Sequence, residues 1–216
     1  MTTKKTLVIT LDDFIFEHYK TKQSIWKNIA KEHKLKLSDT FLLGHYDAHL
    51  EKREKLEREY KQLTPHVQEV DVRYQKVISS TILKPDFNAE NLERLKLWEA
   101  MFDVFYITNH RKEQMLSLMQ MIDVEIDQER LYSTKQVLNA KPEADIYLKL
   151  ARTQNIKPNT MFILDSTLNG VQASYLANAK GLFLAQYLRP NQAIKDFSFA
   201  YFDTLTDVDE YLKELL

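Results

Sequence analysis

Side chains that could hold a phosphate group or a metal ion occur at four places along the chain. Each place lies at or just after the expected C-terminal end of a strand. The places are Thr10 with Asp12 and Asp13, Thr108 with Asn109, Lys141, and Asp165. A hydroxyl or a backbone N–H group can hold a phosphate oxygen, and a lysine can neutralise phosphate charge. A carboxylate can ligate Mg²⁺ or transfer a proton, so the four places together indicate phosphate or magnesium chemistry.

The elements that must position these residues alternate between strands and helices. Short apolar, β-branched runs predict the strands, and longer mixed stretches predict the helices between them. The expected strands are residues 6–11, 104–108, 130–134, 161–164, 182–185 and 198–202, and the expected helices are 111–121, 142–153, 168–179 and 207–216. Such alternation implies parallel strands with right-handed crossovers, and ligands gather at the C-terminal ends of such strands. The sequence thus predicts a doubly wound, mostly parallel, Rossmann-like α/β fold.

Residues 16–95 differ in character from the rest of the chain. The segment is rich in Lys, Glu, Gln, Leu and His and has few strand signals. Ile25, Trp26 and Ile29 recur at helical spacing, and Thr64 before Pro65 can open a further helix. We expect an all-helical insert of roughly four helices. Residues 1–15 and 96–216 then form the α/β core domain, and residues 16–95 form a helical domain.

The composition excludes several classes of protein. Only Gly44, Gly170 and Gly181 are present, so neither a P-loop nor a dinucleotide-binding glycine motif occurs. The absence of cysteine excludes disulfides, thiol nucleophiles and thiolate metal sites. A formal net charge of −1 gives no indication of a nucleic-acid or anionic-membrane partner. No apolar run approaches the ~18 residues of a membrane span or forms a signal peptide, so we expect a cytoplasmic protein.

The order of these motifs resembles that of the haloacid dehalogenase (HAD) superfamily, in particular its capped phosphatase and phosphoglucomutase branch. The resemblance extends over nearly the whole chain and implies that the helical insert is a cap. It makes Asp12 the general acid/base. It places phosphate on Thr108, Asn109 and Lys141. It implies a weakly held Mg²⁺ at Asp165 and Asp12.

The first family motif departs from its pattern in this sequence. The family strand ends in Asp-x-Asp-Gly-Thr, and its first Asp is the nucleophile that forms an acyl phosphate. Here the nucleophile position holds Thr10, the glycine position holds Asp13, and the following threonine position holds Phe14. The hydroxyl of Thr10 is not ionised, and no histidine or lysine adjacent in sequence activates it. The Asp13 carboxylate opposes the binding of an anion, because a glycine N–H normally faces the phosphate there.

The fourth family motif is also incomplete. It carries a second acid near the metal-ligating Asp, but the candidate positions around Asp165 hold Leu164, Asn169 and Gly170. Of the side-chain carboxylates that hold the family's Mg²⁺, only Asp165 remains. A dehalogenase needs the same nucleophilic Asp, so that reaction is undermined as well.

Each of these residues also has an explanation that involves no chemistry. Thr10 can be a β-branched strand residue, Asp12 can be a loop residue, and Lys141 can be solvated before a helix that starts with Pro. Thr108, Asn109 or Asp165 can cap the helix that follows it. His45 and His49, four residues apart, lack the glutamate of a His-Glu-x-x-His zinc motif and are predicted to be surface residues. His110 follows Asn109 and is expected near the mouth of the site.

Three functions are compatible with this sequence. The first is a catalytically impaired phosphatase homologue that keeps a cleft for a phosphate or another anion, with Asp12 and Thr10 at the former reaction centre. The second is an active Mg²⁺-dependent phosphatase that acts on a small phosphorylated metabolite. The third is a non-catalytic module in which the helical cap contacts a protein partner. The sequence identifies neither a substrate nor a partner.

Overall fold

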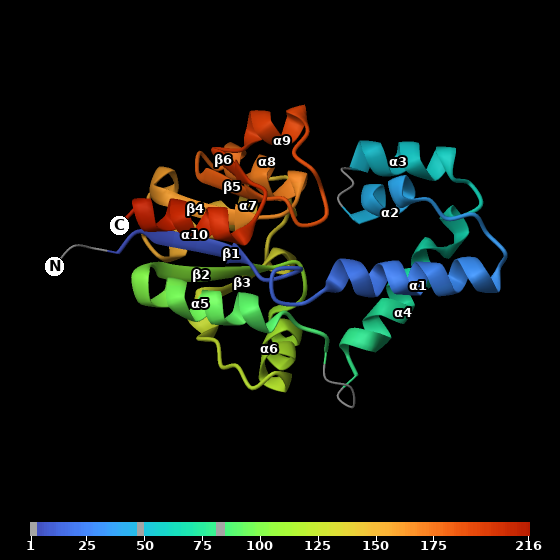
Figure 1. Ribbon diagram of the computed structural model, residues 1–216, viewed down its shortest axis with the longest axis horizontal. Helices are drawn as coiled ribbons and strands as arrows, with labels where there is room; N and C mark the ends of the chain where they lie inside the picture. Colours follow the sequence, from blue (N-terminus) through green and yellow to red (C-terminus); the bar gives the residue numbers. More distant parts are fainter. Residues whose placement is uncertain (1–3, 47–49, 81–84) are drawn as a thin grey trace.

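The computed structural model describes residues 4–46, 50–80 and 85–216, and for residues 50–53 it describes the backbone alone. Its centre is a parallel six-stranded sheet in the order β3-β2-β1-β4-β5-β6 (Figure 1). The strands are β1 (Thr6–Thr10), β2 (Asp103–Thr108), β3 (Leu131–Ser133), β4 (Met161–Asp165), β5 (Lys180–Leu184) and β6 (Ala200–Phe202). This confirms the predicted doubly wound α/β fold.

Helices cover both faces of the sheet because successive strand residues point to opposite sides. In β1, Leu7 and Ile9 belong to one apolar cluster, and Val8 between them belongs to the other. The first cluster lies under α5 (Ala89–Met101), α6 (Lys112–Met121) and α10 (Leu205–Glu214). The second lies under α7 (Asp145–Thr153) and α8 (Leu168–Leu176), and α9 (Gln192–Phe197) packs beside α8. Both faces of the sheet are therefore buried, as the continuous apolar strand sequences require.

The strand order fixes where a ligand site can form. The chain moves outward from β1 to β3 on one side and then returns to place β4 on the other side of β1. The order reverses between β1 and β4, and the crevice at their C-terminal ends is the usual ligand site of such a sheet. Thr10 and Asp165 are the last residues of these two strands.

Between β1 and α5 the chain forms a group of four helices. They are α1 (His18–Glu32), α2 (Asp39–Tyr46), α3 (Leu50–Glu59) and α4 (Val67–Ile78). Three of them, α1, α2 and α4, share a separate apolar cluster. Ile25, Trp26, Phe41 and Tyr74 are buried in this cluster. In Figure 1 the four helices lie together on the right, beyond the sheet. Their arrangement agrees with the expected helical insert.

Helix α5 joins the insert to the sheet. Asn88 caps its N-terminus, and Leu92, Leu95 and Trp98 pack in the core cluster of the sheet. The buried Asn91 side chain donates a hydrogen bond to the Phe14 carbonyl at 2.7 Å, which ties α5 to the loop after β1. The division into domains at residues 15/16 and 95/96 stays a proposal, and α5 crosses its second boundary.

The element boundaries shift by a few residues from those predicted. Helix α10 begins at Leu205 rather than residue 207, because Thr204 and Asp207 form a reciprocal capping box. Helix α7 begins at Asp145 rather than residue 142, after a cis peptide bond between Lys141 and Pro142. Asn178, just after α8, has a left-handed backbone conformation with φ of 57°, which asparagine tolerates.

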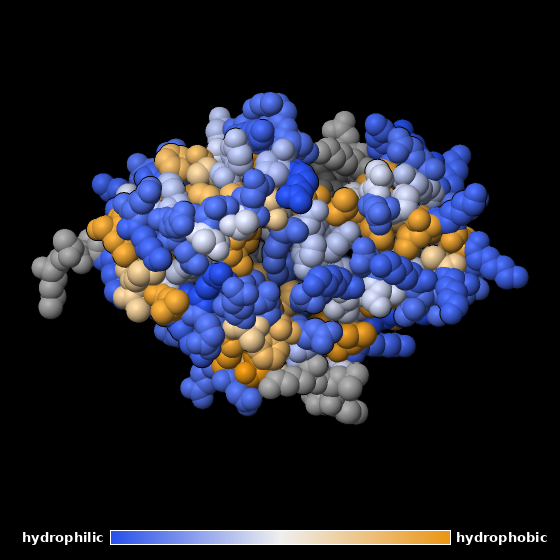
Figure 2. Space-filling model, viewed as in Figure 1, coloured by the Kyte–Doolittle hydropathy of each residue, from blue (hydrophilic) through white to orange (hydrophobic). Residues whose placement is uncertain are grey.

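The molecular surface is predominantly hydrophilic on the face shown in Figure 2, with scattered apolar residues. Among the described residues, no helix combines the length and the apolar character that crossing a membrane requires.

Candidate functional site

The candidate site lies where the C-terminal ends of β1, β2 and β4 meet. Thr10, Thr108 and Asp165 end these three strands, and all three side chains are buried. The loop after β1 carries Asp12 and Asp13. The fold therefore brings the separately predicted residues to one edge of the sheet, where they form two hydrogen-bonded clusters.

The first cluster joins Thr10, Lys141 and Asp165. The Lys141 ammonium donates to Asp165 Oδ2 at 2.7 Å and to Thr10 Oγ1 at 2.9 Å. The Thr10 hydroxyl in turn donates to the same Asp165 oxygen at 2.7 Å. The exposed fractions of the Lys141 and Asp165 side chains are only 6% and 1%, so this ion pair is screened little by solvent.

The other oxygen of Asp165 is occupied by the helix that follows β4. Asp165 Oδ1 accepts from the Thr167 backbone N–H at 2.9 Å and from the Thr167 hydroxyl at 2.6 Å. Thr167 also caps α8 by accepting from the Gly170 N–H at 3.0 Å. A Cβ atom at Gly170 would lie 2.0 Å from Asp165 Cγ, so only glycine leaves room for this carboxylate. Both oxygens of Asp165 thus have two donors each.

The charges of the first cluster are fixed by their mutual contact. Burial alone would raise the pKa of Asp165, but Lys141, Thr167 and Thr10 outweigh it and lower that pKa. Burial alone would lower the pKa of Lys141, but Asp165 outweighs it and raises that pKa. Asp165 is therefore a carboxylate and Lys141 is an ammonium.

This donor set does not fit the Mg²⁺ ion that the fold family implies. Mg²⁺ requires oxygen ligands in near-octahedral geometry, and its protein sites depend on free carboxylate oxygens. Thr10 supplies no carboxylate, and the four donors on Asp165 occupy the positions from which it would bind a metal. An ammonium 2.7 Å from Asp165 Oδ2 also already supplies the neutralising charge. The Mg²⁺ ligand pair Asp165 and Asp12 stays a prediction that this geometry does not favour.

The second cluster surrounds Asp12. The Asn109 backbone N–H donates to Asp12 Oδ2 at 2.9 Å, and the Thr108 hydroxyl lies 3.4 Å from Oδ1. His110 Nδ1 lies 2.6 Å from the same Oδ1. Burial would raise the pKa of Asp12, but the His110 charge and contact, with smaller effects of His18 and Asn109, hold it well below its usual range. Asp12 is therefore ionised and already bound by groups that the resemblance assigns to phosphate.

Asp13 occupies a left-handed backbone position. Its φ is 55°, a conformation that glycine adopts freely, which gives a physical reason for glycine in the family motif. The Asp13 side chain accepts from the Tyr19 backbone N–H at 2.6 Å, and its carbonyl accepts from Gln186 at 2.6 Å. Burial, together with the charge of Asp12, raises the pKa of Asp13 to about 7, although the Tyr19 N–H opposes the shift.

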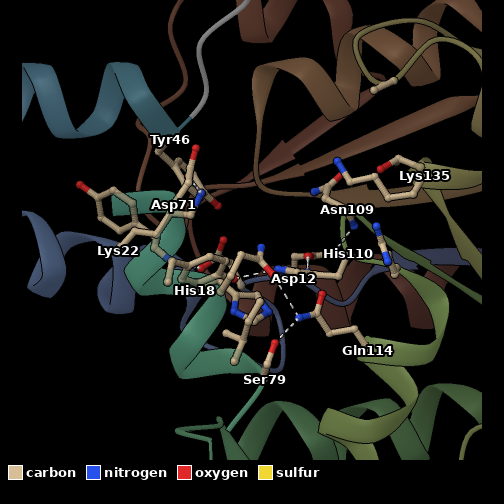
Figure 3. A pocket seen from close by; sticks show the side chains of 18 of the residues that line it. Asp12, His18, Lys22, Tyr46, Asp71, Ser79, Asn109, His110, Gln114 and Lys135 are labelled. Atoms are coloured by element: carbon tan, nitrogen blue, oxygen red, sulfur yellow. Dashed lines mark hydrogen bonds and ion pairs between the residues drawn. The ribbon is translucent and has the colours of Figure 1, made fainter. Parts of the chain in front are cut away.

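A cavity of about 1310 Å³ opens beside both clusters, between the sheet edge and the helical insert. Asp12, Asp13, Asn109 and Lys141 line it from the core side. From the insert, α1, α2 and α4 contribute the lining residues His18, Lys22, His45, Tyr46, Asp71 and Tyr74. Figure 3 shows Asn109 and Lys135 on one side of this space and Tyr46, Lys22 and Asp71 on the other. Thr10, Thr108 and Asp165 lie beneath the lining rather than in it.

Sequence reasoning missed several residues of the site. His18 and Tyr74 lie in the insert and reach His110, whose Nε2 lies 2.8 Å from the Tyr74 hydroxyl. No spacing signal links residues 18, 74 and 110, and only the expected place of His110 near the site mouth pointed here. His45 is half-buried with its ring 4.4 Å from that of Phe41, which differs from the predicted surface position. His49 lies outside the described residues.

The buried ion pair predicts a large effect on stability. Lys141→Met leaves the Asp165 carboxylate buried without its cation, so the free energy of unfolding should fall by about 3–5 kcal/mol. Urea unfolding followed by circular dichroism measures this. The double variant Lys141→Met/Asp165→Asn should regain part of the loss, because no buried charge is then left unpaired. Lys157→Met, at an exposed position, is the control. If Lys141→Met changed the free energy of unfolding by no more than ~0.5 kcal/mol, as the control should, the ion pair would not stabilise the fold.

The raised pKa of Asp13 predicts a pH window for stability. At low pH Asp13 is protonated in both the folded and the unfolded state. Between pH 4 and 7 the unfolded state loses this proton while the folded state keeps it, so stability falls as pH rises through the folded pKa of about 7. Asn tolerates the left-handed conformation and can still accept from Tyr19, so Asp13→Asn should remove the loss without disturbing the loop.

The measurement is the difference in unfolding free energy between Asp13→Asn and wild type at several pH values. The advantage of the variant should grow by up to about 1.4 kcal/mol per pH unit from pH 4 to 7 and then level off. A difference that stays constant over this range would show that Asp13 has an ordinary pKa.

No protein-family model and no curated protein matches this sequence. Solved structures do match along nearly the whole chain. A HAD family hydrolase from Deinococcus radiodurans R1, solved with bound phosphate and sodium, has 16% sequence identity and a TM-score of 0.76, over 99% of this chain and 97% of that one. A hydrolase from Pseudomonas syringae has 13% identity and a TM-score of 0.71, over 98% of each chain.

A third similar structure comes from the phosphoglucomutase branch. The β-phosphoglucomutase from Clostridium difficile has 12% identity and a TM-score of 0.64, over 99% of each chain. Identities this low carry information about the fold and not about the reaction. Sheet order, motif order and these structural matches agree, and the chain therefore has the fold of the HAD-like superfamily.

Proposed function

We propose that this protein binds a small phosphorylated or otherwise anionic metabolite in its cavity and does not hydrolyse phosphomonoesters by the route of the HAD phosphatases. The cluster of Thr10, Lys141 and Asp165 carries the proposal. In that cluster the residues at the nucleophile, lysine and metal-ligand positions bond to one another. Thr10 supplies no carboxylate nucleophile, and the oxygens of Asp165 and the ammonium of Lys141 are already engaged.

Thr10 is poorly suited to replace the aspartate nucleophile. A hydroxyl must lose its proton to a base as it attacks. The neighbours of Thr10 Oγ1 are Lys141, which its raised pKa keeps protonated, and Asp165, whose lowered pKa makes it a weak base. Thr10 is also only 7% exposed and lies beneath the cavity lining. These contacts favour a structural role for it.

The ability to bind an anion rests on different residues. Asn109, Arg111 and Lys135 line the cavity and can donate to anionic oxygens. Lys141 also lines it, but its ammonium is paired with Asp165. The Deinococcus structure with bound phosphate supports phosphate as a ligand class of this fold. The carboxylates of Asp12 and Asp13 lie at the bottom of the same cavity, so an anion is expected nearer to Lys135 and Asn109 than to Asp12. Thr108 is fully buried and would act by positioning Asp12.

An active Mg²⁺-dependent phosphatase is the alternative that the test must exclude. The experiment is Mg²⁺-dependent hydrolysis of a panel of phosphomonoesters by wild type, Thr10→Asp and Asp165→Asn. Wild type should show no more turnover than Asp165→Asn, because both proteins carry Thr10 and lack the aspartate nucleophile. Thr10→Asp restores the family nucleophile and should raise turnover at least ~10-fold. Wild-type turnover that Asp165→Asn abolishes would overturn the proposal.

The binding half of the proposal is tested on the same proteins. Calorimetric titration with inorganic phosphate and with the panel should detect a ligand, and Lys135→Gln should weaken its binding several-fold. Lys157→Gln, an exposed change away from the cavity, is the matched control. Absence of both turnover and anion binding would contradict this proposal and favour a protein-interaction module.

A further inference from the structure

Two histidines and an aspartate converge on one wall of the cavity. Asp12, His18 and His110 each offer a ligand atom, and these three atoms lie within 4.8 Å of one another. Asp12 and His18 are buried, and the His110 side chain is only 10% exposed. All three line the cavity, and Figure 3 shows their side chains gathered together. Since they come from the β1 loop, α1 and the β2 loop, the tertiary fold alone creates the cluster.

The contact between His110 and Asp12 is too poorly aligned to be a simple hydrogen bond. The atoms Nδ1 and Oδ1 are 2.6 Å apart, yet within the described part of the chain the buried Nδ1 has no hydrogen-bond partner of acceptable geometry. The opposite nitrogen of the ring, Nε2, lies 2.8 Å from the Tyr74 hydroxyl. When Nε2 donates its proton to Tyr74, Nδ1 presents a lone pair toward the Asp12 carboxylate. In this tautomer a metal ion can be shared by Nδ1 and the Asp12 carboxylate, whereas in the other tautomer Nδ1 carries the proton and faces Asp12 directly.

The buried His18 side chain gives a second observation in favour of a ligand at this cluster. Its Nε2 is buried and has no hydrogen-bond partner among the residues that the structure describes, an arrangement that costs free energy in a folded protein. This buried nitrogen is therefore available to ligate a metal ion. The ring centroid of His18 lies 4.5 Å from that of His110, so the two imidazoles lie against each other.

We propose that Asp12, His18 and His110 bind one divalent transition-metal ion of the Zn²⁺ class. Imidazole with a single carboxylate suits Zn²⁺, Co²⁺, Ni²⁺ or Fe²⁺ better than Mg²⁺, which prefers oxygen ligands alone. Three protein ligands leave a coordination position open toward the cavity. Zinc bonds of about 2.0–2.2 Å place ligand atoms about 3.3 Å apart, so the cluster reaches this geometry with small side-chain rotations.

The surroundings support this assignment. Asp12 also accepts from the Asn109 N–H, and Tyr74 orients the His110 ring, the kind of outer contact that fixes a metal-ligating histidine. The nearby cation Lys22 opposes a metal ion, but it lies 3.2 Å from Asp71, which compensates its charge. The proposed site shares no ligand with the Lys141 and Asp165 ion pair.

A second cluster, His33, His66 and Glu69, serves as the internal comparison. His66 lies 3.0 Å from Glu69, but Arg73 lies 2.6 Å from Glu69 and already supplies a positive charge there. This cluster lies on the exposed side of the insert, where solvent competes with any metal. We expect it to bind Zn²⁺ far more weakly than the buried cluster.

The test uses the full chain without an affinity tag, stripped with chelator and titrated with Zn²⁺ and separately with Co²⁺. One equivalent of Zn²⁺ should bind, and Co²⁺ should give the intense visible absorption of a low-symmetry nitrogen and oxygen site. His18→Gln and His110→Gln should each weaken Zn²⁺ binding at least ~100-fold. Tyr74→Phe, which keeps the ring and removes only the outer contact, should weaken it about 10–100-fold. Circular dichroism checks that each variant is folded.

Two matched variants control for the second cluster. His33→Gln and His66→Gln should each still bind one equivalent of Zn²⁺ with the affinity of wild type. Loss of that equivalent in these variants, or its retention in folded His18→Gln and His110→Gln, would overturn the proposal. The Co²⁺ spectrum of wild type gives an answer even where a variant does not fold, because exposed aqua-coordinated Co²⁺ absorbs only weakly.

Discussion

The structure of this site depends on the buried ion pair between Lys141 and Asp165. In water such a pair contributes little, but here both side chains are nearly inaccessible and the missing partner would leave a bare charge in the protein interior. Thr10 completes the pair by donating to Asp165 and accepting from Lys141, and Gly170 leaves the space in which the carboxylate lies. The C-terminal ends of β1 and β4 and the start of α8 are thereby held together by electrostatics where a HAD phosphatase would place its reacting groups. This pairing is the basis of the proposal that the cavity binds an anion without phosphoryl transfer.

The remaining charge at the sheet edge is concentrated on Asp12 and Asp13, and the surroundings shift the pKa values of these two carboxyl groups in opposite directions. Asp12 is ionised because His110, His18 and the Asn109 N–H surround it, whereas burial raises the pKa of Asp13 into the neutral range. Two adjacent carboxylates can share one cavity because only one of them carries a full charge below neutral pH. The histidines that stabilise Asp12 come partly from the helical insert, so core and insert share one electrostatic centre. Residues of both the core and the insert line the cavity between them, so the sequence of either segment alone does not predict the site.

The sequence was sufficient for the architecture but only partly for the site. Apolar strand runs and the order of polar residues at strand ends predicted the parallel sheet, and the fold brings Thr10, Asp12, Thr108, Asn109, Lys141 and Asp165 to one edge. Contacts within that set could not be predicted, because whether Lys141 faces a ligand or Asp165 depends on distances of a few ångströms across separate loops. The positions of His18 and Tyr74 depend on how α1 and α4 pack, and their helical spacing indicates only a buried face. The left-handed backbone at Asp13 was concealed because aspartate replaces the glycine that would have marked it.

The central claim is that Lys141 occupies the place of the metal ion at Asp165. Titration of the labelled protein with Mg²⁺, followed by the backbone amide signals of Leu11, Ser166 and Thr167 in nuclear magnetic resonance spectra, tests it most directly. The ion pair predicts no saturable shift of these signals up to Mg²⁺ concentrations on the order of 10 mM, above the range of ordinary protein sites for hard cations. It also predicts that Lys141→Met, which frees the carboxylate, makes Mg²⁺ binding detectable. Saturable shifts in wild type that Asp165→Asn removes would contradict the claim and restore this edge of the sheet as a magnesium site.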